Sequence, residues 1–134
     1  MNLNLRIIIL LLLFANTIVS AKSWQTITCS NSNYNQVQLT QCLKMRYQMI
    51  QNNLRMQYSK ALKQMLSLKS VGSSAPLDPV ATLKKSKSAF LKYRKSACTW
   101  VEASYASGGG SGQATLQCKI KITKQYCHLL KYYA

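Results

Sequence analysis

The chain has 134 residues, and its 18 Lys and Arg against 2 Asp and Glu give a formal net charge of +16 at pH 7. Asp78, Glu102 and the single His128 are the conventional proton-transfer groups, so paired-carboxylate hydrolysis, a Ser-His-Asp triad and an oxygen-ligand metal site each lack parts. A hydrophobic fraction of 48% with only 5 Gly and 2 Pro predicts a folded chain. The composition indicates one compact domain and does not favour an enzyme.

The first 21 residues have the layout of a secretory signal. Arg6 precedes an apolar run from Ile7 to Phe14, and the stretch ends in the residues VSA at Ala21. The run is shorter than the roughly 20 apolar residues that a membrane span needs. We therefore expect a signal peptide at residues 1–21 and a single helical domain at residues 22–134, with a charge of +15, no membrane-spanning segment, and a periplasmic or secreted location.

A long first helix is predicted over residues 37–68, which contain no Gly or Pro. Apolar residues recur there at steps of three and four, namely Leu39, Leu43, Tyr47, Ile50, Leu54, Tyr58, Ala61, Met65 and Leu68. Such spacing is typical of one buried helix face. Met45, Met49, Leu62 and Leu66 widen this face, and we expect the methionines to fill the core.

The segment LKSVGSSAPLDPVA ends the first helix and starts a second. Asp78 suits an N-cap and Pro79 suits the first helical position, so the second helix is predicted from Pro79 to about Ala106. Its expected buried residues are Val80, Leu83, Phe90, Tyr93, Ala97, Val101 and Tyr105. Its expected solvent face carries Lys84, Lys85, Lys87, Lys92 and Lys95.

A glycine-rich break at residues 108–112 lacks the spacing of a phosphate-binding loop and predicts a helix connection. The segment that follows alternates like a strand around Ile120 and Ile122, yet a helical period also runs through Cys118, Ile122, Tyr126 and Leu130. Its length favours a helix. The predicted fold is all-α, a bundle of about three helices in up-down-up order.

Export makes the five cysteines candidates for disulfides. The absence of a C-x-x-C pair and the single His argue against a zinc or redox-active site, so we expect no metal and no cofactor. Cys98 and Cys118 each lie about ten residues from the glycine break, which places them at the same height in a helical hairpin; their bond would contribute around 3 kcal/mol. Of the 15 ways to form two bonds, we expect Cys98–Cys118 and Cys29–Cys42, with Cys127 unpaired.

Several short motifs resemble the LprI-type lysozyme inhibitors, a family of small secreted or periplasmic bacterial proteins with a cysteine-bearing helical domain. They are LTQC at residues 39–42, Leu54 and Tyr58 in LRMQY, SAFLKYRKSAC at residues 88–98, and the glycine-serine break before Cys118. The resemblance covers roughly Cys29 to the C-terminus. This chain departs from the family pattern at four positions. It has Phe90 where the family has Trp, Lys95 where the family has Asp, and Gln51 and Arg55 where the family has Asp and Asn.

The resemblance implies a non-enzymatic binding protein with lysozyme as its partner. An inhibitor is expected to offer a carboxylate or a loop to the enzyme's cleft, and Glu102 is the acid that could supply it. The high positive charge opposes docking onto a basic lysozyme. Arg94 is singled out for a polar role, either in pairing with Glu102 or in binding an anion.

An alternative function is electrostatic binding of anionic envelope polymers, such as lipopolysaccharide and cell-wall or extracellular polyanions. Twelve of the 18 cations lie between Lys44 and Lys95, where Asp78 is the only acid. The candidate basic face consists of Lys84, Lys85, Lys87, Lys92, Arg94 and Lys95. Dedicated nucleic-acid binding is not favoured, because export separates the chain from the genome and no reading motif is present. A Cys127–His128 nucleophile is also disfavoured, since neighbouring residues point about 100° apart on a helix.

Overall fold

The computed structural model describes residues 28–30, 33–72, 76–106 and 108–134. Three helices make up these ranges: α2 (Gln36–Ser70), α3 (Pro79–Ser104) and α4 (Ser111–Tyr133). The described ranges contain no strand, so the strand alternative for the C-terminal segment was wrong and the all-α prediction is confirmed. The expected signal peptide at residues 1–21 lies outside the described residues.

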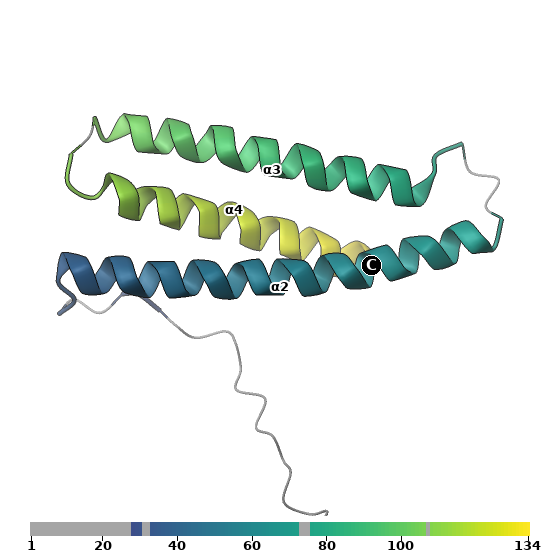
Figure 1. The fold of residues 1–134 in the computed structure, drawn as a ribbon, viewed down its shortest axis with the longest axis horizontal. Helices are drawn as coiled ribbons and strands as arrows, with labels where there is room; N and C mark the ends of the chain where they lie inside the picture. The colour runs from purple at the N-terminus through teal and green to yellow at the C-terminus, as the bar shows by residue number, and fades with distance from the viewer. Residues whose placement is uncertain (1–27, 31–32, 73–75, 107) are drawn as a thin grey trace, which may run out of the picture.

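The helices run up, down and up, as predicted (Figure 1). The α4 helix contacts both of the others and lies between them in this view (Figure 1). At one end of the bundle the glycine turn joins α3 to α4, beside the start of α2; at the other end a loop joins α2 to α3 (Figure 1). None of the helices in the described ranges is long and apolar enough to span a membrane.

Local sequence sets the helix ends. The Asn35 side chain accepts a hydrogen bond from the Gln38 amide and the Gln38 side chain accepts one from the Asn35 amide, which together form a capping box. Asp78 is the predicted N-cap of α3, and its Oδ1 accepts from the amides of Val80 and Ala81. A hydrogen bond from Lys69 and these amides hold the pKa of the Asp78 carboxyl below its usual value.

The core is an apolar cluster contributed by all three helices, formed by Leu54, Ala61, Phe90, Tyr126, Cys127 and Leu130. At its centre the rings of Phe90 and Tyr126 are stacked with centroids 4.1 Å apart. The Tyr126 hydroxyl lies 3.2 Å from the Ser86 Oγ and so has a hydrogen-bond partner at the edge of the core. Burial raises the pKa of this phenol.

The expected apolar face of α2 is buried only where α4 covers it. Ala61 is 2% exposed, whereas Leu68, two turns further along the same face, is 46% exposed. The reason is length: 35 residues of α2 measure about 52 Å and 23 residues of α4 about 35 Å, so α4 ends before α2 does. Met45 and Leu66, expected to widen the face, are also exposed because they lie to its side.

Two aromatic residues of α3 were also wrongly assigned to the core. Tyr93 is 62% exposed and Tyr105 is 48% exposed. Tyr105 follows the last residue of α3, at its C-cap, so the helical period no longer applies to it. Tyr93 lies one residue before the inward-facing Arg94, about 100° around the helix, which turns its ring away from α4.

Candidate functional site

Four of the six residues predicted for the basic face lie together on the outside of α3. Lys84, Lys85, Lys92 and Lys95 are exposed, and a helical rotation of 100° per residue places them within an arc of about 100°. They extend over 11 residues, or about 16 Å. The one ion pair within the described ranges joins Lys69 to Asp78, so the ammonium groups of these four lysines have no carboxylate partner in those ranges.

The other two predicted residues, Lys87 and Arg94, point inward instead. The Lys87 ammonium lies 3.9 Å from the centroid of the Tyr58 ring, a cation–π contact between α3 and α2. Both side chains are half-buried, unlike the four exposed lysines. Both residues thus contact neighbouring helices, whereas the other four face outward.

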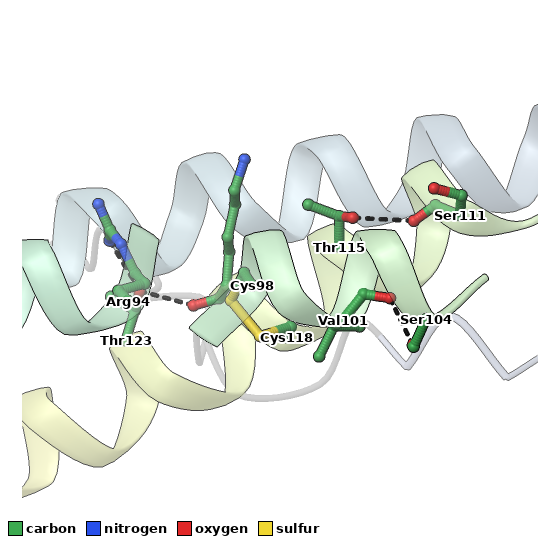
Figure 2. Close-up of a disulfide and its surroundings, with 9 residues drawn as sticks. Arg94, Cys98, Val101, Ser104, Ser111, Thr115, Cys118 and Thr123 are labelled. Atoms are coloured by element: carbon green, nitrogen blue, oxygen red, sulfur yellow. Dashed lines mark hydrogen bonds between the residues drawn. A yellow bond between two sulfur atoms is a disulfide. The ribbon is translucent and has the colours of Figure 1, made fainter. Parts of the chain in front are cut away.

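Arg94 is the centre of a polar network that links all three helices. Its Nη1 donates to Oε1 of Gln51 on α2 at 3.0 Å and to Oγ1 of Thr123 on α4 at 2.9 Å. Thr123 is fully buried and in turn donates to the carbonyl of Lys119. Figure 2 shows Arg94 pointing to Thr123, close to the Cys98–Cys118 disulfide.

The guanidinium is held by neutral acceptors and by rings. Gln51 Nε2 donates to the Tyr47 hydroxyl at 2.9 Å, and the guanidinium carbon lies 5.8 Å from the Tyr47 ring centroid and 5.2 Å from that of Phe90. Pairing of Arg94 with Glu102, one of the two roles considered for the arginine, was wrong: the guanidinium donates to Gln51 and Thr123, and Glu102 makes no ion pair within the described ranges. The network fixes the relative rotation of the helices while the Arg94 charge stays without a carboxylate in the described part of the chain.

Sequence reasoning identified Arg94 but missed both of its partners. One signal was present at Thr123, a polar residue at a buried position of the α4 period, one turn before Tyr126. Gln51 carried no signal in the sequence that separated it from the other polar residues of α2.

Two exposed aromatic residues form a second feature of α3. Tyr93 and Trp100 are 62% and 71% exposed. Seven residues separate them, so they lie within about 20° of each other around the helix and about 10 Å apart along it. Trp100 was not selected from the sequence, although its spacing from Tyr93 was a visible signal. At 100° per residue the two rings lie 60–80° beyond Lys85, so the rings and the four lysines together span about 180° of the circumference of α3.

A shallow hollow of about 400 Å³ lies at the glycine-turn end of the bundle. Its lining includes Lys44 of α2, Glu102 of α3 and Lys119 of α4. Glu102 is exposed, and its carboxylate makes no ion pair or hydrogen bond within the described ranges. Gln113 braces the hollow by donating from Nε2 to Oγ1 of Thr40 at 3.0 Å. The hollow therefore has a mixed charge and a free carboxylate.

Both disulfides are formed at this same end. Cys29 is bonded to Cys42 and Cys98 to Cys118, with Cα atoms 5.9 and 5.6 Å apart. This is the pairing expected from cysteine register. Cys127 is free and buried, and burial raises the pKa of its thiol, which keeps it protonated and unreactive. The described ranges hold no group of three or more His, Cys, Asp or Glu side chains that could bind a metal ion.

Comparison with known proteins found a family match, which covers most of the chain. The family model described as lysozyme inhibitor LprI matches residues 29–130. This range includes all five cysteines and all three helices, apart from the last three residues of α4. Searches of curated proteins and of solved structures found no match. On the extent of the family match, the chain belongs to the lysozyme inhibitor LprI family.

Proposed function

We propose that this chain is a non-enzymatic periplasmic or secreted protein that inhibits lysozyme, and that it docks with the glycine-turn end of its bundle. Family membership supports the class of partner. Two disulfides support an oxidising compartment, where such bonds persist. The observation that carries the choice of surface is the free Glu102 carboxylate beside the hollow, at the end that both disulfides brace.

The mixed charge of this end suits an enzyme cleft that itself carries both signs. A lysozyme uses two carboxyl groups on either side of the scissile bond. Lys44 and Lys119 at the hollow offer ammonium groups to such carboxyls, and Glu102 offers a carboxylate to neighbouring cations. Because the Cys98–Cys118 disulfide ties α3 to α4 at this end, Glu102 and Lys119 are held in place before binding, which lowers the entropic cost of docking.

Net charge then shapes the kinetics of binding and not the contact itself. A protein of about +15 approaching a basic enzyme is repelled at long range, and salt screens that repulsion within about 8 Å at physiological ionic strength. We expect the association rate to rise when salt increases from low to physiological concentration. A polyanion binder would show the opposite dependence.

The test is lysozyme activity titrated with the protein and with Glu102→Gln. The variant should weaken inhibition at least about 30-fold, as expected when one partner of a desolvated charge pair is removed. Gln125→Lys is the matched control, since it raises the net charge by the same amount at an exposed position of α4. Absence of inhibition by the unmodified protein would refute the function, and equal inhibition by Glu102→Gln would refute the docking surface.

A further inference from the structure

We propose that the outer surface of α3 docks onto a bilayer that contains anionic phospholipid. The α3 face is defined here by its exposed lysines and exposed aromatic residues: Lys84, Lys85, Lys92, Tyr93, Lys95 and Trp100. These residues are exposed on the half of α3 opposite to Arg94, which contacts α2 and α4. None of them lines the hollow at the glycine-turn end, so the role of the face does not depend on the lysozyme function.

The charge of the α3 face is the first argument for an anionic bilayer as its partner. No acid occurs on α3 from Pro79 to Val101, and Glu102 lies seven residues, or about 10 Å, beyond Lys95. The four lysines of the face have no ion-pair partner in the described ranges, so nothing there neutralises them. An anionic lipid surface attracts each nearby lysine, by an amount equal to about a fivefold gain in partitioning.

The exposed rings favour an anionic bilayer over a soluble polyanion as the partner. Tyr and Trp combine an apolar body with a polar tip, and they are enriched where lipid meets water. Tyr93 and Trp100 lie in one row about 10 Å apart, too far to stack on consecutive bases, which are separated by about 3.4 Å. Soluble polyanions would explain the lysines but leave two exposed rings without a role. A bilayer uses both groups, with the rings at headgroup depth and the ammonium groups against phosphates.

Part of the α3 face can meet a flat surface: Lys85, Lys92, Tyr93 and Trp100 lie within about 100° of the circumference of the helix. The face extends from Lys84 to Trp100 along one uninterrupted helix of about 24 Å. Arg94 on the opposite side of the helix is bonded to α2 and α4, and Cys98 is bonded to Cys118. These contacts fix the rotation of α3, so the face is presented without rearrangement.

The experiment places the single remaining indole at the proposed contact. The chain has two Trp, and Trp24→Phe leaves Trp100 as the only one. The fluorescence of this protein should shift to the blue with vesicles of phosphatidylcholine and phosphatidylglycerol at a ratio of about three to one, because the indole leaves water. Pure phosphatidylcholine vesicles should produce no shift, and physiological salt should weaken the effect.

Paired lysine substitutions test the surface itself. Lys85→Gln with Lys92→Gln should lower vesicle partitioning about 25-fold, by removal of the two lysines nearest to the rings. Lys121→Gln with Lys124→Gln removes the same charge from exposed positions of α4 and should have a much smaller effect. Equal losses in both pairs would overturn the proposal. So would binding to soluble heparin that exceeds vesicle binding and leaves the Trp100 emission unchanged.

Discussion

Substitution of Gln51 by Glu tests the Arg94 network most directly. In the structure Arg94 Nη1 donates to Gln51 Oε1 at 3.0 Å, and a carboxylate of the same shape at this position accepts the same hydrogen bond. Gln51 also contacts Tyr47: its Nε2 donates to the Tyr47 hydroxyl at 2.9 Å. In the variant this contact is kept, because the Tyr47 hydroxyl can instead donate to the second carboxylate oxygen of the glutamate. The change therefore adds a charge and removes no contact.

The expected gain is about 1 kcal/mol. A hydrogen bond between two ionised groups is roughly twice as strong as one to a neutral acceptor, and the desolvation of a half-buried carboxylate offsets part of this. For a domain of this size such a gain corresponds to a Tm about 4 °C higher. Thermal unfolding followed by circular dichroism at pH 7 measures it.

The pH dependence separates this explanation from a general charge effect. The guanidinium should hold the pKa of the new carboxyl below its unfolded value of about 4.3. The gain is then fully present above about pH 5 and disappears as pH falls through the lower pKa of the folded state. Gln48→Glu, at an exposed position of the same helix, controls for net charge. The reasoning is refuted if Gln51→Glu leaves the Tm unchanged, or if its gain persists in an Arg94→Met background.

Three further results are expected. Thr123→Val keeps the shape of a fully buried side chain but removes an acceptor of the guanidinium, so the free energy of unfolding should fall by about 1–2 kcal/mol in urea titration. The Cys127 thiol should fail to react with a water-soluble disulfide reagent at pH 7.5 and react fully in guanidinium; rapid reaction of the native protein would contradict its burial. Asp78→Ala should lower the Tm at pH 7 but not at pH 2. The pKa of Asp78 is lowered in the folded protein, so its carboxylate stabilises the fold above the unfolded pKa of about 3.9, and this contribution is lost as pH falls through the lower folded-state pKa.

The backbone of this fold could be predicted because local signals agree with one another. Asp78 and Pro79 mark the start of α3, and cysteine register correctly paired Cys98 with Cys118. These features depend on residues near one another in sequence, or on one helical hairpin.

The side chains were harder to predict because their positions depend on relative helix length and rotation. Leu68 continues an apolar face but is exposed, since α4 has already ended. Arg94 looks like a surface cation in sequence and becomes an interhelical donor because Gln51 and Thr123, 43 and 29 residues away, lie opposite it. Such long-range pairs leave no periodic signal in a single sequence.

Because both disulfides lie toward one end, the two ends of the bundle should differ in local stability. At the glycine-turn end Cys98–Cys118 joins α3 to α4 and Cys29–Cys42 joins α2 to the segment before it, whereas the loop between α2 and α3 closes an end that α4 does not reach. Opening should begin at the α2–α3 loop and stop at the cross-linked end, with amide hydrogen exchange fastest near Leu68 and slowest near Cys98. A partly opened molecule would therefore keep intact the end that carries Glu102. Unfolding of the helix turns next to the α2–α3 loop would then leave the proposed docking surface able to bind its partner.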